Sequence, residues 1–220
     1  MDPREMVKEY YAQRAREYDA SAGYLESASE AERGPMKRAI RRALRGRDVL
    51  EVACGTGYWS AVIAASARSV LATDADPGMI DLALKRHGRL PRLRFMVADA
   101  YSLDGVSVDF NAAFAHWWWS HVPRQNIQEF LGALHGRLLP GSLVLFTDQM
   151  PYEARGRRID ADGNAWERRT LTDGRTFEVI KNFPTEEEIR QCLRGRARRV
   201  RYRESKRGYW TLTYLTEQGK

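Results

Sequence analysis

The chain has 220 residues, of which 43% are hydrophobic, and a formal net charge of +7 at pH 7. This length predicts one domain, or one domain with a small insertion, and argues against two complete domains. The sequence has no apolar run of about 20 residues that could cross a membrane, and the charged N-terminus MDPREMVKEYYAQRAREYD lacks the apolar core of a secretory signal. Cys54 and Cys192 are the only cysteines, which argues against a metal cluster or a disulfide framework. We therefore expect a cytoplasmic protein without a metal.

The first 46 residues predict a helical lid. Residues 6–18 have a helical pattern, and residues 19–35 are small and polar, which indicates a loop or a loose helix. Pro35 then begins a basic amphipathic helix that we expect to end near Leu44.

From Asp48 onward, apolar strands alternate with helices, and we assign residues 47–150 to a cofactor-binding core. The expected strands cover residues 48–53, 69–75, 93–100, 110–115 and 142–148. The expected helices cover residues 59–67 and 77–88, followed by a helix after Pro123 whose apolar stripe is Ile127, Phe130, Leu131, Leu134 and Leu138 and which Pro140-Gly141 should stop. This alternation predicts an α/β fold in which helices cover both faces of a parallel sheet.

Residues 151–183 interrupt the alternation, and their second half predicts a β-hairpin around Thr172–Gly174. We place this insertion above the carboxyl edge of the sheet, as a cap over the substrate, because open α/β folds bind ligands at that edge. The remaining residues, 184–220, predict a closing helix and two strands.

The end of the first core strand carries the most informative motif. In VLEVACGTG, Glu51, Ala53, Gly55 and Gly57 form an acid-x-small-x-Gly-x-Gly pattern. The glycines allow a tight turn and a close approach of a ligand to the backbone. A dinucleotide fingerprint would have a third glycine where Ser60 stands, and a carboxylate before the glycines would repel a pyrophosphate. The same carboxylate suits a cationic amino-acid group, so the motif favours S-adenosylmethionine over a dinucleotide.

The next two strands also end in acids. Asp74, followed by Ala75, ends the second strand and can accept hydrogen bonds from both ribose hydroxyls, while Met79 would lie against the adenine. The third strand ends in Asp99-Ala100, where a carboxylate can accept from the adenine amino group. A single acid of this kind is often only a helix N-cap. Three acids at the ends of successive strands, behind a glycine-rich loop, indicate one cofactor site.

With these motifs the sequence resembles the class I S-adenosylmethionine-dependent methyltransferases. The resemblance extends from about Tyr10 to Thr147 and is carried by YYAQRAREYD, VLEVACGTG, LATDADPGMI and VADA. It implies a Rossmann-like, seven-stranded, mostly parallel sheet with helices on both faces and the last strand antiparallel. It also implies a methyltransferase that uses S-adenosylmethionine and releases S-adenosylhomocysteine.

The resemblance places Tyr11 and Arg14 near the methionine carboxylate of the cofactor. On a helix these two residues and Tyr18 would share one face. The alternative is an ordinary amphipathic helix with an arginine that extends to solvent. Tyr24 follows closely enough to cap the same pocket, and the resemblance implies a tyrosine near that position.

The stretch AFAHWWWSHVP follows the fourth strand, where cofactor and acceptor should meet. Ala115 is expected to present its backbone to the cofactor. Trp117 lies four residues before His121 and can form a wall of the methyl site or contact the sulfonium, whereas Trp118 and Trp119 are expected to pack on the neighbouring helix or the hairpin. His121 matches a position that histidine often occupies in this family, as a base for a hydroxyl acceptor or a donor to an anionic one.

The only indication of a substrate comes from FAHWWWSHVP and RRTLTDGRTFEVIKNF, which are similar to phosphonate O-methyltransferases. We therefore expect a small-molecule acceptor with an acidic oxygen, a phosphonate or a carboxylate. An anionic oxygen needs no general base, but it needs cations to bind it, and arginine grips two oxygens at once.

The hairpin offers two arginines, and its register decides between them. If the loop has three residues with Gly174 left-handed, Arg169 shares a face with Phe177 and Lys181; if the turn has two residues, Arg168 takes that place. We favour Arg169 together with Lys181 as substrate-binding residues. The alternative is an exposed hairpin with cross-strand ion pairs, which contribute little stability.

Two other functions remain open. Arginines in the last third, as in RGRARRVRYRESKR, would suit an RNA-binding protein or an RNA methyltransferase, although few aromatic residues accompany them and a solvated surface is the better explanation. A small-molecule N-methyltransferase is the other alternative. We expect a small-molecule partner, no nucleic acid and no membrane, in a monomer or a homodimer.

Overall fold

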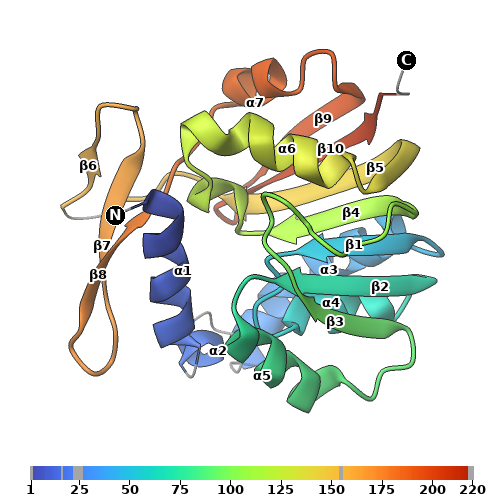
Figure 1. Ribbon diagram of the computed structural model, residues 1–220, viewed down its shortest axis with the longest axis horizontal. Helices are drawn as coiled ribbons and strands as arrows, with labels where there is room; N and C mark the ends of the chain where they lie inside the picture. The colour runs from blue at the N-terminus through green and yellow to red at the C-terminus, as the bar shows by residue number, and fades with distance from the viewer. Residues whose placement is uncertain (1, 16, 22–26, 154–155, 218–220) are drawn as a thin grey trace.

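A seven-stranded sheet forms the centre of the fold, which we describe from a computed structural model of residues 2–15, 17–21, 27–153 and 156–217 (Figure 1). Its strands are β1 (Asp48–Val52), β2 (Ser69–Asp74), β3 (Leu93–Val97), β4 (Phe110–His116), β5 (Leu138–Gln149), β9 (Ala197–Ser205) and β10 (Tyr209–Thr216). They are ordered β3-β2-β1-β4-β5-β10-β9. The first five are parallel, and β10 is antiparallel to β5 and β9. The expected mostly parallel sheet with an antiparallel last strand is confirmed.

Helices cover both faces of this sheet because successive strand residues point to opposite sides. On one face, Val49 and Phe114 pack against α3 (Ser27–Ala43) and α4 (Tyr58–Ala64). On the other, Leu50 and Phe146 pack against α6 (Ile127–His135) and α7 (Glu186–Cys192). α5 (Pro77–His87) lies beside β2 and β3. None of the described helices is both long and apolar enough to cross a membrane.

The N-terminal helices differ from the prediction. α1 (Pro3–Arg14) ends four residues early, and α2 (Tyr18–Ser21) is a separate short helix. α3 contains Pro35 instead of beginning at it. A proline removes one helical hydrogen bond, and the buried Met36 and Ile40 anchor the helix on the sheet beyond it.

The predicted end of the helix after Pro123 was also wrong. α6 ends at His135, and Leu138 belongs to β5, which runs through Pro140 and Gly141. The β4–β5 pairing changes register between Phe110 and Ala112, so the proline lies at an irregular point of the ladder. Apolar periodicity could not mark this boundary, because Leu138 continues the spacing of Leu131 and Leu134 and packs, partly buried, against the same core.

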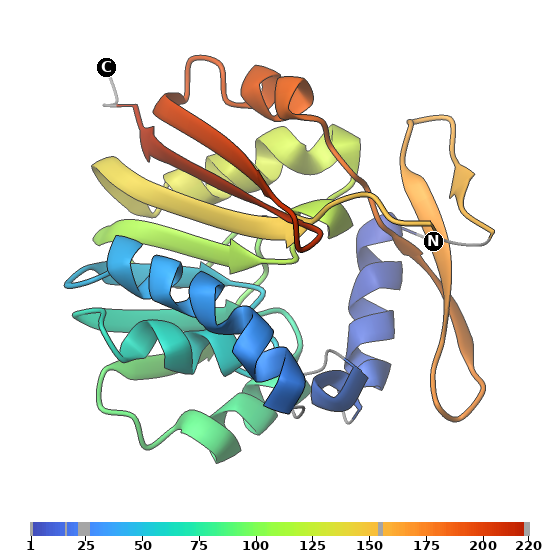
Figure 2. The same cartoon turned by 180° about the vertical axis from the view of Figure 1, so that it is seen from behind.

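The insertion forms a second sheet of three antiparallel strands, β6 (Arg158–Ile159), β7 (Ala165–Thr170) and β8 (Thr176–Ile180). Arg169 pairs with Phe177, and Gly174 has a φ of 88°, so the three-residue loop is confirmed over the two-residue turn. The strand β6 was not predicted. The small sheet packs against α1, which stands between it and the main sheet (Figures 1 and 2). Val7 and Tyr10 of α1 are buried in this contact.

Candidate active site

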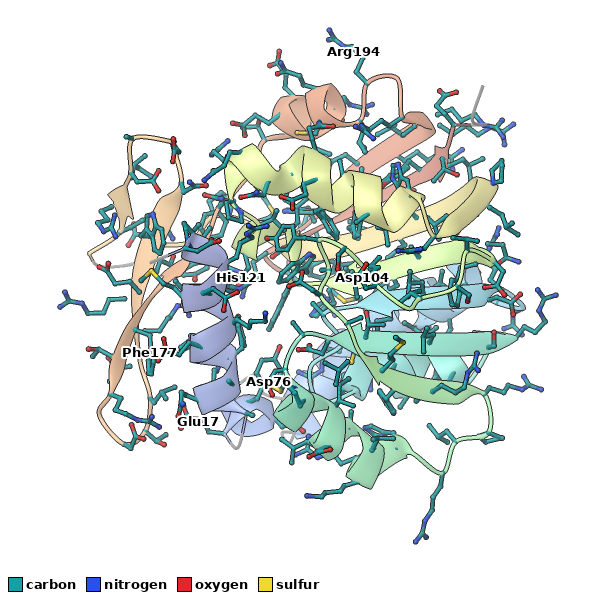
Figure 3. All side chains as sticks on the ribbon, viewed as in Figure 1. Glu17, Asp76, Asp104, His121, Phe177 and Arg194 are labelled. Carbon is teal, nitrogen blue, oxygen red and sulfur yellow. The ribbon has the colours of Figure 1, made fainter. Side chains whose placement is uncertain are left out.

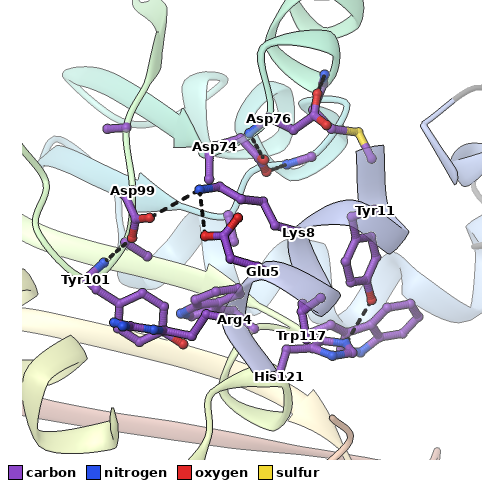
Figure 4. Close-up of a pocket in the computed structure, with 18 of the residues that line it drawn as sticks. Arg4, Glu5, Lys8, Tyr11, Asp74, Asp76, Asp99, Tyr101, Trp117 and His121 are labelled. Atoms are coloured by element: carbon purple, nitrogen blue, oxygen red, sulfur yellow. Dashed lines mark hydrogen bonds and ion pairs between the residues drawn. The ribbon is translucent and has the colours of Figure 1, made fainter. Parts of the chain in front are cut away.

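A pocket opens at the carboxyl ends of β1 to β4 and is covered by α1; we call it the edge pocket (Figure 4). The turn after β1 contributes Ala53 and Gly55, and the turn after β2 contributes Asp74, Ala75, Asp76 and Met79. The segment after β3 contributes Ala98, Asp99, Ala100 and Tyr101, and the segment at the end of β4 contributes His116, Trp117, Trp118 and His121. The helices over it contribute Arg4, Glu5, Val7, Lys8, Tyr11 and Tyr18.

The glycine-rich turn presents backbone to the edge pocket. Ala53 and Gly55 have φ values of 53° and 55°, and both line the pocket. Gly57 does not line it, and its role is in packing. A Cβ on Gly57 would lie 3.0 Å from Cζ of Phe95 and 3.1 Å from Cδ2 of His87. The turn therefore requires this glycine for its own close approach to β3 and α5.

Glu51 lies behind this turn and not in the pocket lining. Its side chain is 2% exposed, and Oε2 has no hydrogen-bond partner among the described residues. Burial raises the pKa of Glu51 to about 8. A carboxyl group in this position is protonated at neutral pH until a cation approaches it.

Asp74 is held by the backbone on both carboxylate oxygens. Oδ2 accepts from the amide of Gly55 at 2.8 Å, and Oδ1 accepts from the amide of Asp76 at 3.0 Å. Each oxygen has a further lone pair for a ligand hydroxyl. Burial raises the pKa of Asp74 to about 6. Beside it, Asp76 caps α5 through the amide of Met79, whose buried side chain forms an apolar part of the wall.

The acid after β3 contacts the lid. Asp99 Oδ1 accepts from the amide of Tyr101 at 2.9 Å, and Oδ2 lies 3.6 Å from Nζ of Lys8 (Figure 4). Lys8 also lies 3.6 Å from Glu5. Sequence reasoning missed Lys8 and Arg4 in the pocket wall. Lys8 lies three residues before Tyr11 and Arg4 lies four residues before Lys8, and this helical spacing along α1 was the available signal.

Tyr11 and His121 form a hydrogen-bonded pair at the inner end of the edge pocket (Figure 4), and His121 lies between α1 and the sheet (Figure 3). Nδ1 of His121 lies 2.7 Å from the carbonyl oxygen of Ile180. Because a carbonyl only accepts, Nδ1 carries the proton, and Nε2 of the neutral ring accepts from the Tyr11 hydroxyl at 2.8 Å. Burial, with the charges of Lys181 and Arg169, lowers the pKa of His121 well below its usual value.

The three tryptophans occupy three environments. Trp117 lines the edge pocket, has a φ of 55° and stacks on His116 with ring centres 4.6 Å apart. Trp118 lines the pocket as well, and its ring contacts Tyr101 at 6.0 Å and Phe130 of α6 at 6.1 Å between ring centres. Trp119 is buried in the main core, 5.5 Å from Phe146, in the same cluster as Ile127 and Phe130 of the neighbouring helix α6.

Two other residues expected near the cofactor are not in the pocket lining. Ala115 is buried within β4 and does not line the pocket. Arg14 lies beyond Tyr11, with its guanidinium carbon 5.9 Å from the ring centre of Tyr11 and 5.0 Å from that of Tyr18. The three side chains therefore meet as expected, although the helix ends before Tyr18. Tyr24 lies outside the described residues.

The two cations expected from the insertion lie behind the edge pocket. Arg169 is half-buried and is bound to Glu167 and to the hydroxyl of Tyr152. Lys181 is 2% exposed, and its Nζ donates to Ser120 Oγ at 2.8 Å and lies 3.5 Å from Asp148. Neither residue lines the pocket, so direct contact with an acceptor stays a prediction.

Comparison with known proteins identifies relatives of the whole chain. Residues 49–141 match the family described as Methyltransferase domain. The structure of DhpI in complex with SAH is 31% identical, has a TM-score of 0.77, and aligns over 98% of this chain and 97% of that one. The DhpI-SAM-HEP complex is 30% identical, with a TM-score of 0.76 and 96% coverage of both chains.

Curated relatives align over shorter stretches. Demethylmenaquinone methyltransferase of Clavibacter sepedonicus is 32% identical over 50% of this chain and 46% of its own length. Phosphoethanolamine N-methyltransferase of Triticum aestivum is 22% identical over 86% of this chain and 43% of its own length. The chain thus spans less than half of the length of these two proteins.

Proposed function

Because the chain belongs to the class I S-adenosylmethionine-dependent methyltransferases, as its motifs predicted, we propose that it methylates an acidic oxygen of a small molecule. The acceptor group is a phosphonate or a carboxylate, and the products are a methyl ester and S-adenosylhomocysteine. The similarity to DhpI, which was solved with SAM and HEP, supports a small-molecule acceptor. The cytoplasmic location and the oligomeric state stay predictions.

The edge pocket fits the cofactor in its chemistry. Open backbone at Gly55 allows a close approach, Asp74 has acceptor capacity for two hydroxyls, and Met79 offers an apolar surface for a base. The buried carboxyl of Glu51 is the nearest acid behind the turn, and its unpartnered oxygen suits a cationic group. When bound, S-adenosylmethionine supplies a methyl group on a positively charged sulfur.

The main support for an anionic acceptor is the set of positive charges around His121. Lys181, Arg169 and Arg14 all lower its pKa, in addition to burial. Burial is also the main cause that lowers the pKa of His116, to about 3. Both histidines of the pocket are therefore weak bases, whereas removal of a proton from a hydroxyl requires a base with a pKa near the working pH. A group of cations beside weak bases favours an acceptor that is already anionic.

Transfer to an anionic oxygen needs no proton movement. A lone pair of the acceptor oxygen forms the new bond to the methyl carbon while the carbon–sulfur bond breaks, and that electron pair stays on sulfur. The chain then has to align the two groups and exclude water. α1 covers the pocket, and the Tyr11–His121 hydrogen bond joins this lid to the segment after β4.

The test is a screen of the purified full chain with isotope-labelled S-adenosylmethionine against phosphonates, carboxylates, phenols and amines. We expect a mass shift of one methyl group on an acidic acceptor, in a product whose labelled methyl group has the NMR chemical shift of an O-methyl ester. Label only on phenols would refute the acceptor class.

A second candidate is N-methylation, which the two phosphoethanolamine N-methyltransferases of Triticum aestivum and Caenorhabditis elegans support. Their names specify phosphoethanolamine, an amine that bears a phosphate. The anionic phosphate would suit the cations around His121, which are Lys181, Arg169 and Arg14. The screen distinguishes the two reactions, because a methyl group on nitrogen and a methyl group on oxygen have different NMR chemical shifts.

A further inference from the structure

A second cavity lies on the other side of Trp117 and His116 from the edge pocket, and we call it the rear cavity. Both residues line the edge pocket and the rear cavity, so they form a shared wall. The rest of the rear cavity comes from elements that the edge pocket does not use: α3, α4, the end of β5 and the turn between β9 and β10. The residues that matter below are Arg33, Trp59, Gln149, Arg207 and Tyr209.

Two tryptophans of the rear cavity have unpaired donors. Nε1 of Trp59 and Nε1 of Trp117 are buried, and neither has a hydrogen-bond partner within the described part of the chain. Buried donors are nearly always paired, because an unmade hydrogen bond costs about 1–3 kcal/mol. Within the same described residues, Trp118 and Trp210 also have unpaired indole donors and do not line the rear cavity, so unpaired donors indicate a ligand here only together with the charges and rings around them.

The charge of the rear cavity has one sign. Among its described lining residues, the charged side chains are Arg33 and Arg207, which come from α3 and from the β9–β10 turn. Arg33 Nε donates to the hydroxyl of Tyr58 at 3.0 Å, which holds its guanidinium at the cavity. His116 is neutral because burial lowers its pKa to about 3. Two arginines beside unpaired donors favour an anionic oxygen group.

The remaining surface is aromatic. Trp59, Trp117 and Tyr209 line the rear cavity, and Trp59 also contacts the ring of His116 with centres 4.7 Å apart. Aromatic faces bind flat apolar groups, and the amide of Gln149 can donate or accept at the edge of such a group.

We infer that the rear cavity is a second ligand site, which takes a flat apolar molecule carrying a carboxylate or phosphonate. It lies across the Trp117–His116 wall from the edge pocket and is distinct from the Arg169 and Lys181 positions. The inference does not depend on which atom the enzyme methylates.

Calorimetric titration of phenylphosphonate into the full chain, saturated with S-adenosylhomocysteine, tests the site. We expect saturable binding at one site, no binding of the neutral analogue benzyl alcohol, and a loss of about tenfold in Arg207→Ala, the effect of one charged hydrogen bond. Trp59→Phe keeps a ring but removes a donor, and it should weaken binding several-fold. Arg203→Ala is the matched control, because Arg203 is an exposed arginine of β9 outside the lining.

Two outcomes would overturn the inference. One is the absence of saturable phenylphosphonate binding. The other is binding that Arg169→Ala weakens and Arg207→Ala does not, since the ligand would then lie at the insertion. Titration of S-adenosylhomocysteine into each variant shows that the fold is intact. Failure of that titration in the unmodified chain would count against the proposed function and not against the rear cavity.

Discussion

Asp74→Asn is the most direct perturbation of the edge pocket. The carboxylate accepts from Gly55 at 2.8 Å and from Asp76 at 3.0 Å, with one lone pair on each oxygen left for a ribose hydroxyl. Asparagine keeps the size and one acceptor oxygen, but its amide nitrogen cannot accept. A hydrogen bond to a charged group contributes about 1.5–3 kcal/mol. The loss of one such bond predicts roughly 10- to 150-fold weaker binding of S-adenosylhomocysteine.

The pKa of Asp74 gives the same prediction a pH dependence. Burial raises it from 3.8 to about 6, so the free protein is protonated there at lower pH. Affinity for S-adenosylhomocysteine should fall about fivefold from pH 6 to pH 5, because the ionised fraction of Asp74 falls by that factor, and should be nearly constant above pH 7. The contribution of this group to folding has the opposite sign: it is full below the unfolded pKa and is lost as the pH rises through 6.

Isothermal titration calorimetry between pH 5 and pH 8 measures both effects. The matched control is Asp81→Asn, on the exposed face of α5, which changes the same charge outside the pocket lining. Equal affinity of Asp74→Asn and the unmodified chain, or the same fall below pH 6 in both, would refute the reasoning. Asp74→Ala should also abolish the rise in melting temperature that S-adenosylhomocysteine produces.

Four further predictions follow from named groups. Glu51→Gln should stabilise the fold by about 3 kcal/mol at pH 7 and little at pH 4, because burial raises the pKa of Glu51 from 4.5 to about 8. Urea denaturation measures the free energy of unfolding, and an equal effect at both pH values would contradict this prediction. Arg169→Ala should lower the rate of methylation of an acidic acceptor at least tenfold, while the affinity for S-adenosylhomocysteine stays unchanged. Its control is Arg168→Ala, which changes an exposed arginine on the opposite face of β7. If Arg169→Ala weakened cofactor binding as much as it slowed methylation, the role of Arg169 would be structural. Tyr11→Phe should cost about 1–3 kcal/mol in urea denaturation, because it leaves Nε2 of His121 unpaired, and an unchanged midpoint would reject that hydrogen bond. Micromolar protein should show no salt-sensitive gel shift with RNA at low salt; a shift would favour the RNA-binding alternative.

The cofactor side of the site could be predicted from the sequence because its signals are local. Asp74 ends β2 and Asp99 follows the end of β3, and the carboxyl ends of neighbouring parallel strands meet at one edge of the sheet. Gly174 likewise set the register of the hairpin, since a left-handed residue at that position is typical of a three-residue loop.

Residues that depend on contacts between distant segments could not be predicted. Lys8 reaches Asp99 only because Val7 and Tyr10 pack α1 against β8, some 170 residues further along the chain. Alternation along β8 predicts that Lys181, the residue after its end, shares a face with Phe177, but alternation carries no information on the depth of burial. The structure buries Lys181 beside Asp148, an acid that the sequence pattern showed only as the end of β5.

The run of three tryptophans shows how one strained residue separates identical side chains. Three residues in regular structure would point in directions fixed by a helix or a strand, and at least one indole would face solvent. The left-handed φ of 55° at Trp117 breaks that regularity directly after β4 and costs about 1–2 kcal/mol for a residue other than glycine. Stacking of Trp117 on His116, together with the burial of Trp119, offsets this cost. The result is a tryptophan in the core, one against α6, and one that stands as the wall between two cavities. Strain at an active-site edge is retained where the conformation has a use, and here that use is to present ligand-facing surface on both sides of one side chain.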